Sequence, residues 1–588
     1  MVKPTILKGN RLEIKGEKID NTARTYDTMD RLSTRTDSLL RKEIYSYDLN
    51  GNLITFSDRK GRISRFGYDG LNRRISSIFD DGTRTEFVYD GAGRLTTVTD
   101  TVSGPITFAY DNLDRLTSEA IPLGIVSYGY DAIGRRTSMS ANGGTPVTYS
   151  YDAASRLTQV AQGTQIVGLG YDAAGRRTTL TYPNSVTTSY SYDQASRTTQ
   201  ILHQSVSSII ENLTYTYDAA GNRISFSRTG PQADLPRPVQ AAYDAANEQI
   251  QFNSTTPNLM YDSNGNLISQ ADANGTTTYS WDARNRLVGL NRTVIASNSE
   301  AISASFTYDA LGRRTSKTIN GVTTQYIYDR YNIVAEIQNG VIEATYLRGL
   351  RIDEAFVRQT SSNEYYHTDA LGSVMGLTDQ TGAMQTTYSY DPFGNTAITG
   401  TSANPFQYTG RENDGTGLYY YRARYYSPRL QRFISEDPIR LLGGINFYRY
   451  VRNNPLRFKD PLGLEHDTLW PWVPDENEPD YTPEEAQEVL FHNIDVGIDH
   501  LINDLVELGG IIAEHASEAI LDYFLPLEFM LIPNTLEPPP AEAEVLPIFP
   551  PAPPGPPGAP SDGGGGSGSG SGSSGGGSSG GGGMGGRK

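Results

Sequence analysis

Residues 214–226 read TYTYDAAGNRISF, and stretches of this form decide the fold. Residue character alternates up to Tyr217, a turn follows at 218–221, and a second alternating run begins at Arg223, which is typical of two strands joined by a tight turn. The Tyr-Asp dipeptide recurs about every twenty-one residues. A fixed period predicts one hairpin unit copied many times, each copy burying its apolar face against its neighbours. The aspartates of these dipeptides are Asp27, Asp48, Asp69, Asp90, Asp111, Asp131, Asp152, Asp172, Asp193, Asp218, Asp244, Asp262, Asp282 (after Trp281 instead of Tyr), Asp309 and Asp329, and later Asp391.

The third residue after each aspartate follows a narrow rule. It is Gly, Asn, Asp or Ser, all of them turn residues, and the first three tolerate left-handed backbone. Glycine alternates with the other types, from which we infer a structural period of two hairpins. Our hypothesis is that the glycine turns pack closely against a neighbouring coil, where no side chain fits; the alternative is drift between two tolerated types. The positions are Asp30, Gly51, Asn72, Gly93, Asp114, Gly134, Ser155, Gly175, Ser196, Gly221, Asn247, Gly265, Asn285 and Gly312.

The repeated tyrosines allow two interpretations. A large amphipathic ring at a strand end stacks on neighbouring strands while its hydroxyl reaches a polar group. An aromatic stripe that binds sugars or peptides is the alternative. Because the spacing is so regular, we favour packing.

Charge divides the chain at about residue 464. Residues 1–464 contain 48 Lys and Arg against 46 Asp and Glu, whereas residues 465–588 contain 2 against 21, so the net charge of −17 lies in the tail. Such a distribution does not indicate nucleic-acid binding. The absence of cysteine excludes disulfides and thiolate metal sites. The first eighteen residues lack a long apolar run, so we expect no signal peptide and no transmembrane helix.

Four motifs follow the regular repeats: YYHTDALGS at 365–373, YDPFG at 390–394, QYTGRE at 407–412 and GLYYYRARYY at 417–426. They resemble the Rhs-associated core of the Rhs/YD-repeat family, which includes polymorphic bacterial toxins, the C component of insecticidal toxin complexes and, more distantly, teneurins. The resemblance implies a mainly β fold whose YD-repeat hairpins spiral into a complete or partial hollow shell. The expected domains are a YD-repeat shell at 1–345, the core with an aspartyl autoprotease motif at 346–464, a helical variable segment at 465–530 and a Pro-rich, then Gly/Ser-rich disordered tail at 531–588.

Two Asp-Pro pairs end the core, at Asp437 and Asp460. Proline favours an extended backbone at the residue before it, and two carboxyl groups brought together share a proton, which supplies a general base and a general acid. Spacing alone leaves open that these pairs merely close turns. The resemblance implies an intramolecular aspartyl protease in which Asp437 and Asp460 are the catalytic pair, Arg424 orients them, and the bond Leu464–Glu465 is cut.

Two residues depart from the family pattern. Arg440 and Gln431 stand where the family commonly has Gly. Neither change removes a carboxylate, so they question the efficiency of cleavage more than its chemistry.

The segment after residue 464 occupies the place of the family's variable effector. A helix start is predicted at 482–485, a break at Gly509-Gly510 and a second helix at 511–524. His492 and His500 would share a helical face with Glu488 and Asp499, but acidic amphipathic helices place such groups on a solvated face, so we expect no metal site and no cofactor. No motif assigns an activity or target to this segment.

Three functional hypotheses follow. The first is a toxin-encapsulating shell that cleaves itself after Leu464 and holds residues 465–588 as cargo. The second is a non-enzymatic cell-surface or adhesion protein whose repeats bind carbohydrate or protein, and the third is a degenerate Rhs tip with an inactive tail. For the first we expect export by a dedicated system to the outside or the cell surface, with a secretion carrier and an immunity protein as partners. Because repeat-like sequence begins near Met1, we further hypothesise either a truncated N-terminus or a partner chain that completes the shell.

Overall fold

The computed structural model describes the hairpin repeats and the core. The chain divides into two units, Met1–Asn534 and Thr535–Lys588, and every described residue lies in the first. The described part is almost entirely antiparallel β-structure, which confirms the predicted mainly β fold. The helices predicted after residue 464 lie outside it. The described residues are 7–8, 11–12, 23–233, 235–236, 238–295, 301–440, 444 and 446–464.

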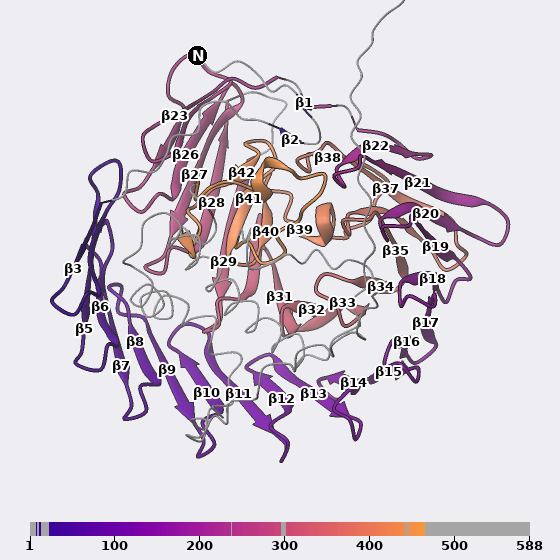
Figure 1. Cartoon of the computed structure of the whole chain (residues 1–588), viewed down its shortest axis with the longest axis horizontal. Helices are drawn as coiled ribbons and strands as arrows, with labels where there is room; N and C mark the ends of the chain where they lie inside the picture. The colour runs from indigo at the N-terminus through magenta and orange to yellow at the C-terminus, as the bar shows by residue number, and fades with distance from the viewer. Residues whose placement is uncertain are drawn as a thin grey trace, which may run out of the picture. The chain divides into compact units, whose positions relative to one another are not determined.

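The first large sheet runs from β3 to β22, each strand pairing with the next in sequence (Figure 1). A separate hairpin, β1 (Leu7–Lys8) and β2 (Arg11–Leu12), precedes it. The strands of the first sheet are β3 (Ala23–Tyr26), β4 (Leu32–Thr36), β5 (Lys42–Tyr47), β6 (Leu53–Ser57), β7 (Ile63–Tyr68), β8 (Arg74–Ile78), β9 (Arg84–Tyr89), β10 (Leu95–Asp100), β11 (Gly104–Tyr110), β12 (Leu116–Ile121), β13 (Gly124–Tyr130), β14 (Arg136–Ala141), β15 (Val147–Tyr151), β16 (Leu157–Gln162), β17 (Gln165–Tyr171), β18 (Arg177–Thr181), β19 (Thr187–Tyr192), β20 (Thr198–Gln204), β21 (Ile209–Tyr217) and β22 (Arg223–Arg228).

The second large sheet has fourteen strands in sequence order, β25 to β38. A two-stranded sheet, β23 (Ala241–Tyr243) and β24 (Gln249–Phe252), precedes it. The strands are β25 (Leu259–Tyr261), β26 (Leu267–Asp272), β27 (Gly275–Trp281), β28 (Leu287–Val294), β29 (Ile302–Tyr308), β30 (Arg314–Ile319), β31 (Val322–Asp329), β32 (Asn332–Gln338), β33 (Val341–Arg348), β34 (Ala355–Gln359), β35 (Glu364–Thr368), β36 (Val374–Thr378), β37 (Met384–Tyr390) and β38 (Thr396–Thr399).

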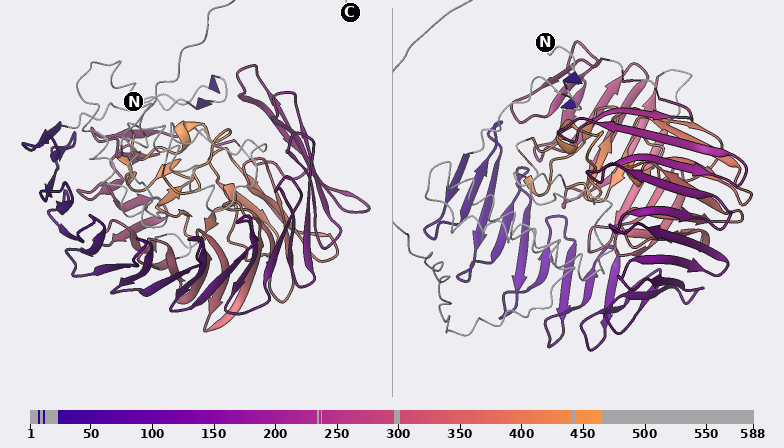
Figure 2. Two further views of the ribbon diagram at one scale, coloured as in Figure 1. Left: turned by 60° about the horizontal axis from the view of Figure 1, so that its bottom comes forward. Right: turned by 45° about the vertical axis from the view of Figure 1, so that its right-hand side comes forward.

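A third, four-stranded sheet forms the end of the core and packs against the second large sheet (Figure 2). Two short 3₁₀ turns flank it, η1 (Tyr408–Gly410) and η3 (Val451–Asn453). Its strands are β39 (Glu412–Asn413), β40 (Tyr419–Tyr421), β41 (Arg424–Ser427) and β42 (Arg432–Phe433).

The Tyr-Asp repeats from Asp27 to Asp309 fold around their aspartates. In the turn at Asp90, Oδ1 accepts the N–H groups of Ala92 at 2.9 Å and Arg94 at 3.0 Å, and the Gly93 N–H donates to the Asp90 carbonyl at 3.1 Å. The Arg94 Nε then donates to Asp90 Oδ2 at 2.7 Å. Since the register shifts beside the preceding Tyr89, this is a hairpin turn closed by a left-handed residue and a bulge.

All fourteen turn positions have left-handed backbone, as predicted for the Gly, Asn and Asp positions, and Ser155 and Ser196 share it. Their φ angles are 59–62° at Asp, Asn and Ser and 79–94° at Gly. The hypothesis of close packing at the glycines is wrong for five of the seven, because a Cβ placed on Gly51, Gly134, Gly175, Gly221 or Gly312 meets nothing within 4 Å. It holds at Gly265, where a Cβ would lie 2.5 Å from the Tyr448 hydroxyl.

The alternation has a different physical cause. The residue after a turn glycine donates to the side chain at the corresponding position of the next turn, as Arg94 does to Asp114 at 2.7 Å and Arg135 to Ser155 at 3.2 Å. Three further pairs repeat this contact: Asn52 with Asn72, Arg176 with Ser196, and Asn266 with Asn285. Glycine has no side chain to accept such a bond, so turns of the two types form pairs.

The tyrosines pack as predicted. The Tyr110 hydroxyl donates to the Leu95 carbonyl at 2.9 Å, and Arg94 lies over the Tyr110 ring at 5.0 Å from its centroid. Trp281, which replaces Tyr, makes the equivalent bond through Nε1 to the Leu267 carbonyl at 2.8 Å. Rings of this kind therefore tie one hairpin to the previous one.

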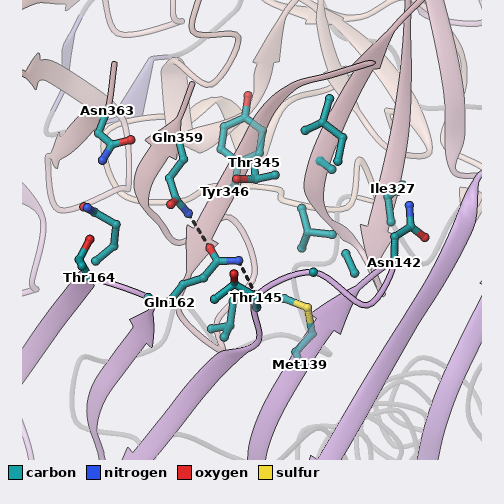
Figure 3. A pocket seen from close by; sticks show the side chains of 18 residues that line it. Met139, Asn142, Thr145, Gln162, Thr164, Ile327, Thr345, Tyr346, Gln359 and Asn363 are labelled. Atoms are coloured by element: carbon teal, nitrogen blue, oxygen red, sulfur yellow. Dashed lines mark hydrogen bonds between the residues drawn. The ribbon is translucent and has the colours of Figure 1, made fainter. Parts of the chain in front are cut away.

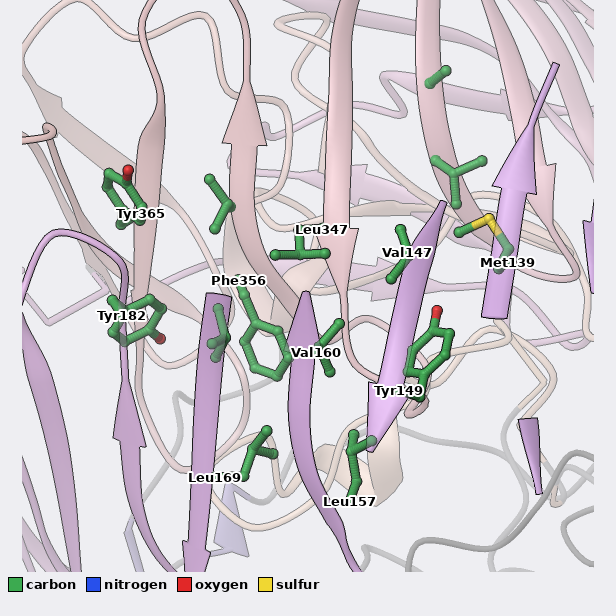
Figure 4. Close-up of a cluster of buried hydrophobic side chains, with 14 of the residues drawn as sticks. Met139, Val147, Tyr149, Leu157, Val160, Leu169, Tyr182, Leu347, Phe356 and Tyr365 are labelled. Atoms are coloured by element: carbon green, nitrogen blue, oxygen red, sulfur yellow. The ribbon is translucent and has the colours of Figure 1, made fainter. Parts of the chain in front are cut away.

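The largest apolar core lies between the two large sheets. Figure 4 shows first-sheet side chains such as Val147 and Val160 facing Leu347 and Phe356 of the second sheet. These four side chains are at most 2% exposed. Burial on both facing layers is what allows long sheets of short hairpins to be stable.

Candidate functional site

Arg424 is the centre of the candidate site. It begins β41 and is 2% exposed, with its guanidinium carbon 3.6 Å from the centroid of the Phe433 ring. Its Nη1 donates to the Phe447 carbonyl at 2.9 Å, and its Nε donates to the Gly463 carbonyl. The stacking and the two bonds fix the direction in which Nη2 points.

The third nitrogen, Nη2, meets both predicted aspartates. It lies 2.8 Å from Asp437 Oδ2 and 3.4 Å from Asp460 Oδ2. The two carboxylate oxygens are therefore separated by no more than the sum of these distances, and both residues are at most 4% exposed. The structure thus brings together the three residues that the resemblance singles out, although Asp437 and Asp460 are twenty-three positions apart in sequence.

Both aspartates also close turns of the repeat type. Asp437 Oδ1 accepts the Ile439 N–H at 3.0 Å, and the Arg440 N–H donates to the Asp437 carbonyl at 3.0 Å. Asp460 Oδ1 accepts the Leu464 N–H at 2.9 Å. Closing a turn and meeting Arg424 are compatible, since the first uses Oδ1 and the second uses Oδ2.

The two departures from the family pattern fall on left-handed backbone. Arg440 has φ of 56° and Gln431 has φ of 62°, which explains why glycine suits both positions. A residue with a side chain is strained there by roughly 1–2 kcal/mol. At Arg440 that side chain has a partner, Glu43 of β5, at 2.5 Å.

Burial raises the pKa of the Asp460 carboxyl group. Removal from water raises the pKa of its carboxyl above the ordinary value, although Arg424 and the backbone N–H groups of residues 462–464 oppose the shift. A carboxyl group with a raised pKa beside a second carboxyl group that is closer to the arginine is an arrangement suited to general acid–base chemistry.

The segment that ends in Leu464 is held against the β40–β41 turn. The Ala423 N–H donates to the Leu462 carbonyl at 3.0 Å, and Arg422 donates to the Pro461 carbonyl. Gly463 has φ of 71°, and a Cβ there would lie 2.2 Å from the Tyr421 carbonyl oxygen. Leu464 is consequently fixed beside the carboxyl pair, while Glu465 lies outside the described residues.

Sequence reasoning missed the residues that support this arrangement. Arg422 Nη2 binds Asp353 at 2.6 Å, and Arg411 Nη1 binds the same carboxylate at 2.5 Å. Burial of Asp353 raises its pKa, but the two arginines outweigh this and lower the pKa to about 2. Arg422 belongs to the quoted RARYY motif, whereas nothing in the sequence pattern distinguishes Asp353.

The cavity between the large sheets and the other predicted sites are separate from Arg424, Asp437 and Asp460. A cavity of about 480 Å³ opens between the large sheets, where Gln359 donates to Gln162 at 2.5 Å (Figure 3), and none of the three site residues lines it. Within the described ranges, no group of His, Asp and Glu is arranged to hold a metal ion. The helices resolved between residues 7 and 464 include none long and apolar enough to cross a membrane. The His492 and His500 pair lies outside the described residues.

Comparison with known proteins gives consistent results. The family model for the teneurin YD-shell matches residues 5–146, 123–210 and 183–456. Among curated proteins, the chain is 31% identical over 287 residues to the tRNA nuclease WapA of Bacillus subtilis, covering 46% of this chain and 12% of WapA. It is 29% identical over 311 residues to the toxin protein Tse5 of Pseudomonas aeruginosa, covering 43% of this chain and 24% of Tse5.

Among solved structures, the complex described as TcdB2-TccC3-TEV is similar in fold. The TM-score is 0.59 at 19% identity, over 76% of this chain and 28% of that one. The chain therefore spans less than a third of the length of each of these relatives.

Proposed function

The chain belongs to the teneurin YD-shell family, and we propose that it is a shell that cuts its own backbone after Leu464 and keeps residues 465–588 as cargo. The observation that carries the proposal is the convergence of Asp437 Oδ2 and Asp460 Oδ2 on one arginine nitrogen. The fixed position of Leu464 beside Asp460 adds to it.

The reaction is hydrolysis of one peptide bond. Asp437, which makes the shorter contact with Arg424, takes a proton from the attacking water. Asp460, whose burial favours the neutral form, donates its proton to the Leu464 carbonyl as the tetrahedral intermediate forms. Collapse of the intermediate passes a proton to the departing nitrogen, which leaves a new carboxyl group at Leu464 and a new amino terminus at Glu465. Arg424 holds the two carboxyl groups in register throughout.

Asparagine substitution of either aspartate tests this mechanism. Each of Asp437→Asn and Asp460→Asn keeps the turn-closing oxygen but removes a proton-transfer group, so we expect full-length protein where the wild type gives two fragments. Intact-mass analysis of the purified protein reports both the cut and its position. A wild-type chain that stays uncut, or a cut elsewhere than after Leu464, would refute the proposal.

The cargo is proposed from position and from the relatives. Two of the matched proteins are named as a nuclease and a toxin, so we assign residues 465–588 an effector role, export by a dedicated system and an immunity protein as partner. Expression of residues 465–588 in bacteria, with and without the shell, measures toxicity and its suppression. Equal growth of cells with the free segment and with an empty vector would contradict the effector role.

A further inference from the structure

The loop that carries Asp437 is held by ion pairs to residues at the beginning of the first sheet. Arg59, in the turn between β6 and β7, binds Glu436 through both nitrogens, at 2.9 Å to Oε1 and 2.7 Å to Oε2. Glu43 of β5 binds Arg440 in the same two-pronged way, at 2.5 and 2.8 Å. Planar pairs of this kind fix orientation as well as distance. The residues before and after the Asp437-Pro438-Ile439 stretch are therefore both held from outside the core.

These ion pairs are buried, and further charged residues take part in them. The side chains of Arg59, Glu43 and Glu436 are 3%, 2% and 10% exposed. Arg59 also binds Asp37 at 2.9 Å, and Arg35 lies 3.4 Å from Glu43. Buried charges of both signs compensate one another here, so the loss of one partner leaves another charge without its counter-charge.

A second contact leads from the same strands to the reacting groups. Arg35 lies over the Phe447 ring, 5.2 Å from its centroid. The Phe447 carbonyl accepts the Asp437 N–H at 2.8 Å and the Arg424 Nη1 at 2.9 Å. The first sheet therefore supports both the loop of Asp437 and the carbonyl that orients Asp437 and Arg424.

Residues of the second sheet contact the same ion pairs from another side. Arg59 Nη2 donates to the Asn264 carbonyl at 2.5 Å, and the Tyr448 hydroxyl donates to the Gly265 carbonyl at 2.8 Å. Gly265 packs closely here, and a Cβ there would lie 2.7 Å from Glu436 Oε1. Glu436 is thus confined on two sides, which is why its position depends on both sheets.

We propose that Arg59 and Glu43 are positioning residues for Asp437, which make self-cleavage conditional on docking of the first hairpins onto the core. This inference rests on the proposed self-cleavage. The contacts join residues 377 and 397 positions apart, so they form only when the N-terminal hairpins and the core have come together. A chain whose first hairpins are not docked would keep its carboxyl groups but hold Asp437 loosely, and would cut slowly.

The test measures cleavage rates of the full chain made by pulse-labelled cell-free synthesis. Arg59→Gln removes the two-pronged contact, and Arg59→Lys keeps the charge but not the planar fork. Arg284→Gln is the matched control, because Arg284 forms a buried ion pair with Asp100 of the first sheet at 2.6 Å without touching residues 436–447. Melting temperatures of the same variants in an uncut Asp460→Asn background measure their stability.

We expect Arg59→Gln to cut at least tenfold more slowly, since displacing a catalytic group by about 1 Å costs up to a hundredfold. Arg59→Lys should cut at an intermediate rate, and Arg284→Gln at the wild-type rate despite a similar loss of stability. A wild-type rate in Arg59→Gln, or equal slowing in Arg59→Gln and Arg284→Gln, would overturn the inference.

Two further outcomes are distinguishable. If Arg59→Gln gives no folded protein, the rate of Arg59→Lys decides, because a slowed rate supports the inference and a wild-type rate refutes it. If the wild type itself is not cut, or Asp437→Asn is cut as fast as the wild type, the proposed self-cleavage fails first. If the wild type is cut and only the Arg59 variants are unaffected, self-cleavage stands and this inference alone fails.

Discussion

Gly463→Ala should distinguish the effect of the position of the Leu464–Glu465 bond on the cleavage rate from the effect of backbone strain on stability. Gly463 has φ of 71°, and its added Cβ would lie 2.2 Å from the Tyr421 carbonyl oxygen and 3.0 Å from the backbone nitrogen of Arg424. An ordinary carbon–oxygen contact is about 3.3 Å or more, so the segment must retreat by about 1 Å. The Gly463 carbonyl, which accepts the Arg424 Nε, and the Leu464 N–H, which binds Asp460, move with it.

The control has the same backbone without the contact. Gly415 also has φ of 71°, lies in the same core and would place a Cβ with nothing within 4 Å. Both variants carry left-handed strain of about 1–2 kcal/mol, but only Gly463→Ala should displace the bond that we propose is cut. We therefore expect Gly463→Ala to slow cleavage by about a hundredfold and Gly415→Ala to leave the rate unchanged.

The assay is the time course of fragment formation after synthesis, with melting temperatures measured in the uncut Asp460→Asn background. Similar stability losses with very different rates are the expected pattern. If the two alanine variants cut at the same rate, the close contact at Gly463 does not position the bond, and the argument from its geometry is wrong.

Two predictions concern stability. Burial raises the pKa of Glu43, but attraction to Arg440 and its neighbours outweighs this and lowers the pKa from 4.5 to about 2. The ionised Glu43 therefore stabilises the folded state by about 3 kcal/mol. This stabilisation is present above pH 4.5 and is lost as the pH falls towards 2. Glu43→Gln should therefore unfold with a weaker acid dependence between pH 5 and 2 in urea titrations, and an unchanged dependence would contradict the assignment. Asn285→Ala should cost about 2 kcal/mol, because its Oδ1 accepts three hydrogen bonds, whereas Gly134→Ala should cost about 1 kcal/mol of strain alone. A larger loss in the Gly134 variant, measured by thermal melting, would refute this order.

The sequence was sufficient to predict the repeat turn in detail. At the fourteen turn positions from Asp30 to Gly312 the residues are turn formers, most of which tolerate left-handed backbone, and φ is positive at all fourteen. The cause of the glycine alternation was not predictable from one turn, because it lies in bonds to the next turn, such as that of Arg135 to Ser155. Packing of a glycine against another part of the chain, as at Gly265, requires the tertiary structure.

The candidate site was predictable only through its motifs. Asp437, Asp460 and Arg424 are marked by the family resemblance, and the structure brings them together. Arg59 carries no such mark, since its position in the turn is filled elsewhere by Ala, Leu and Asn. Its role follows from pairing with a residue 377 positions away, which local periodicity does not encode.

The turn at Asp460 in the candidate site differs from the repeat turn at Asp309 in two residues, Pro461 for Ala310 and Leu464 for Arg313. At Asp309, the Arg313 N–H binds Oδ1 and its Nε binds Oδ2 at 2.7 Å, so the turn supplies its own counter-charge. At Asp460 the equivalent residue is Leu464, which donates its N–H to Oδ1 but has no charge for Oδ2. The second oxygen is then available to Arg424, which it shares with Asp437. Burial raises the pKa of Asp460, so this turn can hold the proton that the proposed hydrolysis requires.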